Sequence, residues 1–508
     1  MKKLFKLIFS RFSLILVAIL TQLCLYVFLP IFLQAAFPFA KLNIAFTLLS
    51  VVIVVFIINS DMTIEAQLPL IILCITLPIV GIAFCAIFLK PGIPKKVRLT
   101  ATDIKNKITP VLSYPKDDEI ENDTANRKIG IFNYVYNVSG LRTYKSNDAI
   151  FFDSGEKFFD ALKAALLKAQ KFIFMEYFII DNGTIWTQIK DILAQKAAQG
   201  VEVRLMYDDL GTIALLPSSF PKQMKVLNIK CQKFNEYSRV ASALYNNRDH
   251  RKITVIDGEI GFVSGANIAD EYANVISPYG YWKDSALMIS GSAVNNLTCM
   301  FLQLYDIQSG NVDEPQKYCV EISNKKIGSL ICPFGDGPKY AYGDLIAQSV
   351  YLNIINTAQN YVHITTPYLI IDSKIKYALI NAAKRGVEVV IITPAVPDKK
   401  AVYAITRSYY NELSVGGVQI YELTGSFVHA KQIVADGDIA CVGTINLDYR
   451  SMLHHYECGV LMYNTSCIAD IESDFVTMIG KSERKEKFKQ NLFVRLFAAL
   501  IRLFTPLF

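Results

Sequence analysis

Histidine and tryptophan are scarce in this chain, and its cysteines do not occur in closely spaced pairs. Of 508 residues, five are histidine and two are tryptophan, and the ten cysteines are scattered singly with no C-x-x-C pair. A structural zinc site needs clustered Cys or His ligands, so this scatter argues against one. Charged residues make up only 19% of the chain and hydrophobic residues 52%. We expect no metal site, no cofactor and structural cysteines, with the excess of apolar residues concentrated in one part of the chain.

That part is the first ninety residues. Apolar stretches occupy 13–34, 43–58 and 67–89, and the first and third match the length of about 20 residues that a helix needs to cross a membrane. Basic residues, which favour anionic lipid head groups, flank the apolar part: Lys2, Lys3, Lys6 and Arg11 before it, and Lys90, Lys95, Lys96 and Arg98 after it. We expect residues 1–90 to form an N-terminal transmembrane region with two or three helices. The number of spans and the sidedness of the remaining chain stay open.

Two further segments are set apart by composition. Residues 91–138 are rich in Lys, Asp, Glu and Asn, and we interpret them as a polar linker with some helix. Residues 487–508, KFKQNLFVRLFAALIRLFTPLF, combine apolar residues with four basic ones. This pattern is typical of a basic amphipathic helix lying in the membrane interface. A terminal helix packed on the protein's own core would show the same pattern, so both interpretations stay open.

The remaining chain repeats itself. Residues 171–181 resemble 361–372, and residues 200–207 resemble 386–393; each is an apolar strand-like run that follows a helical stretch. Helices alternating with apolar strands predict a parallel sheet covered by helices. We therefore expect the α/β class, with two similar α/β/α lobes related by an internal pseudo-two-fold axis, at 139–325 and 326–486.

A third repeated block carries the polar residues. Residues 250–267 and 429–446 share the pattern H-x-K-x4-D, followed by two small residues and an asparagine. Each block contains an Asp-Gly pair between apolar runs, which predicts a hairpin. The shared residues are His250, Lys252, Asp257, Ser264, Gly265 and Asn267 in the first block, and His429, Lys431, Asp436, Gly443, Thr444 and Asn446 in the second.

These residue types suit phosphodiester chemistry. Residues i and i+2 of a strand point to one face, so each histidine is presented with its lysine. One neutral imidazole can attack phosphorus and form a phosphohistidine, while the other donates a proton to the leaving oxygen. The lysines and asparagines can hold the phosphate oxygens without a metal. Asp257 and Asp436 fall at the turns, where we expect them to support the hairpins.

Paired H-x-K-x4-D blocks resemble the phospholipase D superfamily, from about residue 139 to the C-terminus. The segments 207–211, 281–284, 333–338 and 443–451 further resemble the bacterial cardiolipin synthase family. The resemblance implies that His250 is the nucleophile and His429 the general acid and base. It also implies that Asp284 and Glu457 bond the far nitrogen of each histidine, which would fix the tautomer.

Two departures from the family accompany this resemblance. Ser264-Gly265 stands where two glycines are usual, and His454-His455 precedes Glu457 where less imidazole is expected. We interpret His454 and His455 as structural, because adjacent residues on a strand point apart. His363 lies in an apolar strand, and we expect it in the core.

By resemblance, two phosphatidylglycerol molecules would give cardiolipin and glycerol at a bacterial plasma membrane, with anionic membrane lipids as partners. A hydrolase of the phospholipase D type would use the same residues and differ only in product. A nuclease is disfavoured by the apolar segments and by the lack of a basic-aromatic strip for nucleic acid. A non-enzymatic membrane scaffold would predict decay of one H-x-K-x4-D copy, yet both are intact. The sequence does not separate phosphatidylglycerol from phosphatidylethanolamine as donor or acceptor.

Overall fold

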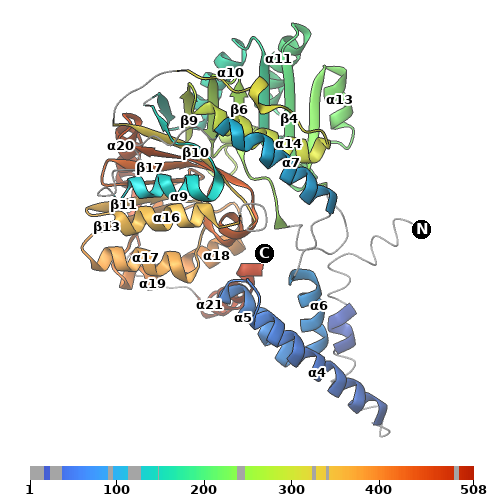
Figure 1. Ribbon diagram of the computed structural model, residues 1–508. Coiled ribbons are helices and arrows are strands. Elements are labelled where there is room, and N and C mark those ends of the chain that lie inside the picture. Colours follow the sequence, from blue (N-terminus) through green and yellow to red (C-terminus); the bar gives the residue numbers. More distant parts are fainter. Residues whose placement is uncertain are drawn as a thin grey trace. The chain divides into compact units, whose positions relative to one another are not determined.

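The computed structural model in Figure 1 describes residues 17–22, 37–89, 95–112, 127–146, 148–236, 246–322, 328–338, 343–485 and 491–507. The chain divides into two compact units, each described by itself below. A terminal unit contains residues 1–94, 237–246 and 496–508, and a main unit contains residues 95–236 and 247–495.

The first sheet of the main unit has seven strands in the order β2-β9-β7-β6-β3-β4-β5. Only β3, β4 and β5 run parallel to one another; every other neighbouring pair is antiparallel. The strands are β2 (Ala149–Phe152), β3 (Phe172–Tyr177), β4 (Glu202–Asp208), β5 (Ile229–Phe234), β6 (Lys252–Ile256), β7 (Ile260–Ser264) and β9 (Ala286–Ser290). The helices of this half include α10 (Gly155–Leu166), α11 (Thr184–Ala198), α13 (Phe220–Val226) and α14 (Val294–Ser309).

The second sheet has nine strands in the order β1-β10-β19-β17-β16-β11-β13-β14-β20. Its strands are β1 (Tyr144–Lys145), β10 (Leu330–Asp336), β11 (Tyr361–Thr365), β13 (Glu388–Pro394), β14 (Gln419–Leu423), β16 (Gln432–Ala435), β17 (Ile439–Gly443), β19 (Glu457–Tyr463) and β20 (Ser482–Arg484). The helices of this half include α16 (Ile346–Thr357), α17 (Ser373–Lys384), α18 (Lys400–Ser408), α19 (Tyr410–Val415) and α20 (Cys467–Gly480).

Seven strands of the second sheet repeat the first sheet strand for strand. The order β10-β19-β17-β16-β11-β13-β14 has the same sequence of antiparallel and parallel pairings as β2-β9-β7-β6-β3-β4-β5. The duplication read from the sequence is therefore present in the fold. The expected parallel sheet is a mixed sheet, because the hairpins β6–β7 and β16–β17 add antiparallel strands beside the three parallel ones.

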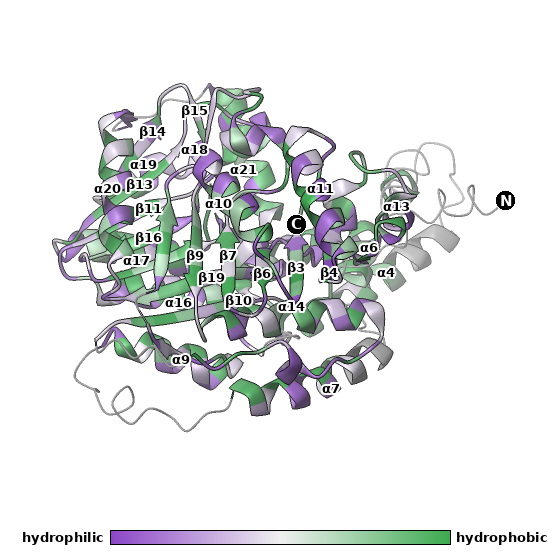
Figure 2. Cartoon of the chain, turned by 90° about the horizontal axis from the view of Figure 1, so that it is seen from above, coloured by the Kyte–Doolittle hydropathy of each residue, from purple (hydrophilic) through white to green (hydrophobic). Residues whose placement is uncertain are grey.

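Burial of apolar strands holds the two sheets together. All six residues of β3 are buried, and Figure 2 shows hydrophobic residues along the central strands of both sheets. Strands β7 and β9 of the first sheet contact β17 and β19 of the second. A further short parallel pair joins the halves: β8 (Tyr281–Lys283) from the first and β15 (Ser426–Val428) from the second.

The segment expected to be a polar linker, 91–138, contains two helices of the main unit. Helix α7 (Lys95–Leu112) packs against α14, and α9 (Ile129–Ser139) packs against α16 and β10. Residues 113–126 between them lie outside the described residues.

In the terminal unit, α4 (Phe37–Ile58), α5 (Ile64–Thr76) and α6 (Pro78–Phe88) pack against one another. Their buried side chains form a small apolar cluster that also includes Leu507. Among the described residues, no helix is both long and apolar enough to span a membrane. The stretch 67–89, expected as one spanning helix, is instead divided at Leu77, because Pro78 begins a new helix there.

The other expected membrane segments are only partly described. Of the stretch 13–34, only residues 17–22 belong to the described residues. Near the C-terminus, helix α21 (Leu492–Phe504) lies within the predicted amphipathic segment, whereas Lys487 and Lys489 lie outside the described residues.

Candidate active site

His250 lies two residues before the start of β6 and is bonded to a carboxylate of the second half. Its Nδ1 lies 2.9 Å from Glu457 Oε1 and 3.0 Å from Oε2. Glu457 is the first residue of β19 and is fully buried, and its Oε2 also accepts a hydrogen bond from Thr444 Oγ1. A neutral histidine that donates its Nδ1–H to a carboxylate keeps an unshared electron pair on Nε2. This geometry leaves the electron pair of His250 Nε2 free, as a nucleophile would require.

His429 makes the corresponding contact in the other direction. Its Nδ1 lies 2.7 Å from Oδ2 of Asp284, a fully buried residue that follows β8 in the first half. Both histidines therefore have the same bond to a buried carboxylate, and in both pairs the carboxylate belongs to the opposite half of the chain.

Backbone pairing across the halves explains why the partners meet. The His250 N–H donates to Tyr456 O at 2.9 Å, which places the next residue, Glu457, beside His250. The His429 N–H donates to Lys283 O at 2.7 Å, where β8 and β15 end side by side, and this brings Asp284 to His429. The two bonds are related by the same pseudo-symmetry as the sheets.

The two motif lysines are completely buried. Lys252 Nζ donates to the backbone oxygen of His250 at 2.5 Å, and Lys431 Nζ donates to that of His429. Burial lowers the pKa of Lys252 to about 8 and that of Lys431 to about 7. Since desolvation disfavours the ammonium ions, an anion that entered this site would be attracted strongly.

Burial also lowers the pKa values of the two motif histidines. It lowers the pKa of His250 well below the ordinary value, and the charges of Lys252 and Lys431 lower it further. Burial and Lys431 lower the pKa of His429 to about 4, although Asp284 opposes the shift. Both imidazoles are therefore neutral at pH 7 before substrate binds. A phosphate diester brings one negative charge, which would favour protonation of the imidazole that serves as the acid.

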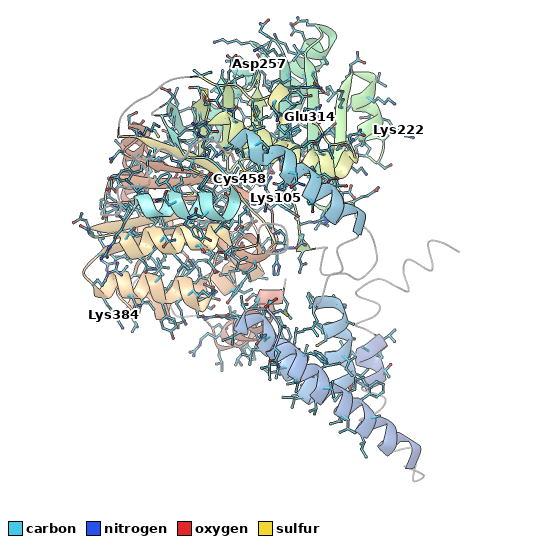
Figure 3. All side chains as sticks on the ribbon, in the orientation of Figure 1. Lys105, Lys222, Asp257, Glu314, Lys384 and Cys458 are labelled. Atoms are coloured by element: carbon cyan, nitrogen blue, oxygen red, sulfur yellow. The ribbon has the colours of Figure 1, made fainter. Side chains whose placement is uncertain are left out.

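Asp257 and Asp436 occupy the hairpin turns with φ of +56° and +52°. The Asp257 carboxylate, labelled in Figure 3, accepts the N–H groups of Gln170, Lys171 and Phe172 at 2.7–2.8 Å, just where β3 begins. The Asp436 carboxylate accepts those before β11: Gln359, Asn360 and Tyr361. Each aspartate thus ties its hairpin to the start of the neighbouring strand, as a supporting residue would.

The small residues after each hairpin allow close approach. A Cβ at Gly265 would lie 2.1 Å from Asp284 Oδ1, and a Cβ at Gly443 would lie 2.2 Å from Cys458 O. Thr444 fills the next position and bonds both Glu457 and the Cys458 backbone. Ser264 Oγ instead donates to Ala266 O at 2.9 Å, within its own loop.

The two motif asparagines differ in their hydrogen bonding. Asn267 Oδ1 accepts from the Ile179 N–H, and its Nδ2 donates to Tyr272 Oη, so its amide is bonded within the protein. Asn446 is buried as well, and its Oδ1 has no hydrogen-bond partner among the described residues.

Sequence reasoning missed the surroundings of the histidines. His454 and His455 do not lie on a strand: a π-helical turn over Arg450–His454 precedes β19, and it directs His455 toward the site. The His455 ring centroid is 5.4 Å from that of His250, and burial lowers the pKa of His455 to about 3. Aromatic rings complete the walls, with Phe178 beside His250, and Tyr272, Trp282 and Phe427 around His429. Except for Phe427, these rings lie far from their histidine in the sequence, which therefore carries no signal of the contact. His363, expected in the core, is buried and bonds Glu472 at 2.9 Å.

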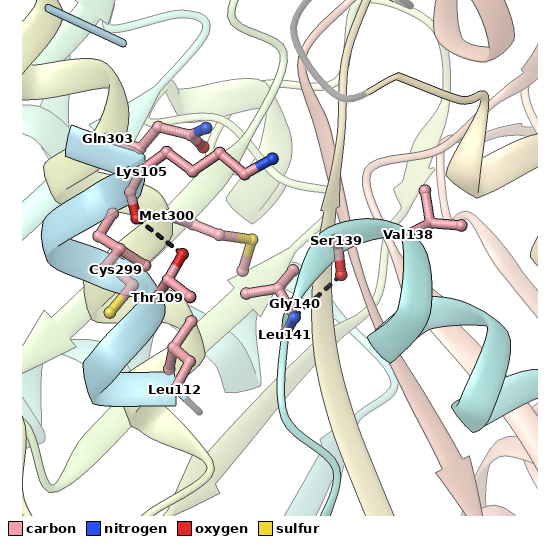
Figure 4. A pocket seen from close by; sticks show the side chains of 11 residues that line it. Lys105, Thr109, Leu112, Val138, Ser139, Gly140, Leu141, Cys299, Met300 and Gln303 are labelled. Atoms are coloured by element: carbon pink, nitrogen blue, oxygen red, sulfur yellow. Dashed lines mark hydrogen bonds between the residues drawn. The ribbon is translucent and has the colours of Figure 1, made fainter. Parts of the chain in front are cut away.

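A separate pocket of about 70 Å³ lies between α7, the end of α9 and α14 (Figure 4). Its walls include Lys105, Thr109, Leu141, Met300 and Gln303, and none of the predicted site residues lines it. Its volume is far below that of pockets for small molecules, which hold about 300–1,000 Å³. We therefore place the chemistry at the paired histidines.

Known proteins resemble both the sequence and the fold. Residues 162–278 and 351–479 match the family described as cardiolipin synthase, PLD-like domain. A cardiolipin synthase of Halalkalibacterium halodurans is 34% identical over 370 residues, which cover 72% of this chain and 73% of that protein. An uncharacterized protein of Streptococcus mutans is 36% identical over 458 residues, covering 89% of this chain and 99% of its own.

Among solved structures, the crystal structure of phosphatidylserine synthase from Haemophilus influenzae superposes with a TM-score of 0.58. It is 14% identical and covers 75% of this chain and 97% of that one. At this identity the likeness shows a shared fold.

Proposed function

The chain belongs to the cardiolipin synthase family of PLD-like proteins, and from this premise we propose that it joins two phosphatidylglycerol molecules into cardiolipin and glycerol. It is an enzyme of phosphatidyl transfer. The observation that carries the proposal is the crosswise pairing of His250 with Glu457 and of His429 with Asp284. A scaffold would need neither pair. Both pairs are buried, where a carboxylate or an imidazole destabilises the fold unless it is hydrogen-bonded or has a chemical function.

The first step forms a phosphohistidine. His250 Nε2 attacks the phosphorus of the first lipid, and the bond between phosphorus and the glycerol oxygen breaks. His429, protonated in the charged complex, gives its proton to that oxygen, and glycerol leaves. Lys252 and Lys431 stabilise the phosphate oxygens as negative charge shifts onto them.

The second step returns the enzyme to its starting state. Neutral His429 accepts the proton of the terminal hydroxyl of a second phosphatidylglycerol, whose oxygen attacks the phosphohistidine. The bond between phosphorus and His250 breaks, and cardiolipin is released. Water competes for the same intermediate, so transfer requires that the lipid alcohol be held closer than water.

We propose that helix α21 brings this chemistry to a membrane surface. Its exposed residues are largely apolar, with basic Arg495 among them, while Arg502 is half-buried; the exposed apolar residues are Leu492, Phe493, Val494, Leu496, Phe497 and Leu500. Exposed apolar side chains beside basic ones suit an anionic lipid interface. Phosphatidylglycerol is itself anionic, so the lipids that bind helix α21 would include the substrate.

The test is a product assay. Purified protein in phosphatidylglycerol vesicles would be followed by mass spectrometry for cardiolipin, phosphatidic acid and glycerol, beside His250→Ala and His429→Ala. His363→Ala is the matched control, because His363 is also buried and bonded to a carboxylate through Nδ1 at 2.9 Å. We expect cardiolipin with equimolar glycerol from the wild type and His363→Ala only. Phosphatidic acid without cardiolipin would instead establish a hydrolase that uses the same residues.

A further inference from the structure

Three buried side chains, one of them the proposed nucleophile, bring ligand atoms close together. His250, His455 and Glu457 each present one nitrogen or oxygen, and these atoms lie within 4.8 Å of one another. His250 Nδ1 is 2.9 Å from Glu457 Oε1, and His455 Nδ1 is 3.6 Å from the same oxygen. The cluster combines two imidazoles and one carboxylate in a site with little access to water.

His455 is the member without a satisfied bond. Its exposed fraction is 7%, yet neither of its ring nitrogens has a hydrogen-bond partner among the described residues. The other buried histidines, His250, His363 and His429, each bond a carboxylate within 3.0 Å. Burying a polar group without a hydrogen-bond partner is unfavourable, so its persistence calls for a ligand or another explanation.

We propose that His250, His455 and Glu457 form a binding site for a borderline divalent cation, Zn²⁺ above all, and that occupation of this site inhibits the enzyme. Two imidazoles and one carboxylate are a ligand set that zinc accepts with its fourth position open. Zinc–ligand bonds of about 2.0 Å at tetrahedral angles hold the ligand atoms about 3.3 Å apart. The distances of 2.9 and 3.6 Å to Glu457 lie on either side of that value, and all three ligand atoms lie within 4.8 Å of one another.

Inhibition follows from the chemistry of the imidazole. A cation between His250 Nδ1 and Glu457 replaces the proton that they share. The neutral ring then carries its single proton on Nε2, and that nitrogen loses the electron pair with which it would attack phosphorus. This consequence rests on the proposed role of His250, whereas the binding of the cation does not.

Binding is tested without lipid or turnover. The full-length protein in metal-free detergent solution would be titrated with Zn²⁺ by equilibrium dialysis and with Co²⁺ by visible absorption, which reports tetrahedral coordination. His455→Asn removes one ligand, and His454→Asn is the matched control, because His454 is the neighbouring imidazole outside the cluster. We expect His455→Asn to weaken binding by roughly 10–100-fold or more, and His454→Asn to bind like the wild type. Equal affinity in all three proteins, or no binding, would overturn the site.

Inhibition is tested in the product assay, with each variant compared with its own metal-free activity. We expect Zn²⁺ to stop product formation, a chelator to restore it, and His455→Asn to need roughly tenfold or more Zn²⁺ for half inhibition. An unchanged inhibition midpoint would refute the inhibitory role. If His455-dependent Co²⁺ binding is found in a protein that makes no cardiolipin, the proposed function fails and the cation site stands. A synthase that binds no cation leaves the function intact and refutes the site.

Discussion

At the scale of single residues, the site depends on which nitrogen of each histidine holds the proton. Glu457 accepts from Nδ1 of His250, and Asp284 accepts from Nδ1 of His429, which leaves Nε2 of both rings for the reaction proposed above. The sequence, through the family resemblance, predicted that these carboxylates bond the histidines. It could not predict which carboxylate meets which histidine, because that depends on backbone pairing between residues about 150–200 positions apart.

Glu457→Gln should therefore cost activity without unfolding the protein. The amide keeps the size of the carboxylate but loses the charge that stabilises the His250 tautomer, and we expect cardiolipin formation to fall by about 10²–10⁴-fold. The control is Glu472→Gln, which alters the equivalent bond to His363 outside the site. Initial rates together with circular dichroism would check this, and equal losses in both variants would show that the effect is structural.

The pH dependence should reflect the buried lysines. Since burial lowers the pKa of Lys431 to about 7, this group loses its positive charge as the pH rises above that value in the free enzyme. We expect kcat/KM for phosphatidylglycerol in mixed micelles to fall between pH 7 and 9, by up to about tenfold per pH unit. A value of kcat/KM that stays constant up to pH 9 would mean that Lys431 is not needed in its charged form.

Gly265→Ala should act on the site through Asp284. The added Cβ would lie 2.1 Å from Asp284 Oδ1, so the carboxylate must move away from His429. We expect a loss of activity similar to that of Asp284→Asn, with a stability cost of about 1–3 kcal/mol. Gly130→Ala in helix α9 meets nothing within 4 Å and should instead stabilise the protein by about 0.5–1 kcal/mol. Activity and thermal denaturation would be measured for both variants.

At the scale of elements, the hairpin turns link neighbouring strands. The Asp-Gly pairs were readable from the sequence, and both aspartates have the positive φ that such turns need. Their bonds to the start of β3 and β11 were not readable, because those strands lie some 75–90 residues earlier in the chain. The π-helical turn before β19 was not readable from the sequence either, because such a turn has no simple sequence pattern. This turn is the reason that His455 reaches the site.

Asp436→Asn should destabilise the protein at neutral pH and little at low pH. Although burial opposes it, Lys128 and three backbone N–H groups together lower the pKa of Asp436. A lowered pKa in the folded state adds stability above the unfolded value of about 3.9, and this stability is lost as the pH falls through the folded value. We expect a cost of about 1–3 kcal/mol at pH 7, shrinking below about pH 4. Denaturant unfolding would measure it, and Asp438→Asn, which loses only a more exposed bond to Lys128, should cost less.

Helix α21 should decide how strongly the protein binds to membranes. Replacing Phe493 and Leu496 by Glu removes two exposed apolar side chains and adds negative charge to the helix. We expect binding to anionic vesicles to weaken about tenfold or more, because each apolar side chain contributes about 1.5–3 kcal/mol when buried. Val415→Glu, at a residue 90% exposed, is the control. Vesicle sedimentation would measure the effect; equal binding of all proteins would refute a role for α21.

At the scale of the whole molecule, duplication is the feature that the sequence predicted best. Three pairs of similar segments indicated two similar α/β lobes, and the two sheets share strand order and direction over seven strands. The N-terminal part was predicted less well, because hydropathy counts apolar residues along the chain and does not indicate where a helix ends. Hydropathy therefore did not register that Pro78 divides the stretch 67–89 between α5, a helix of 13 residues that begins at Ile64, and α6, a helix of 11 residues.

Duplication of a domain usually creates redundancy, because one copy keeps its function when the other is damaged. Here each copy holds the imidazole of one pair and the carboxylate of the other, so neither copy contains a complete pair of its own. On the proposed mechanism, a lesion in either half would stop both chemical steps, because each step needs both pairs. The duplicated halves therefore depend on each other, and neither would form a complete pair without the other.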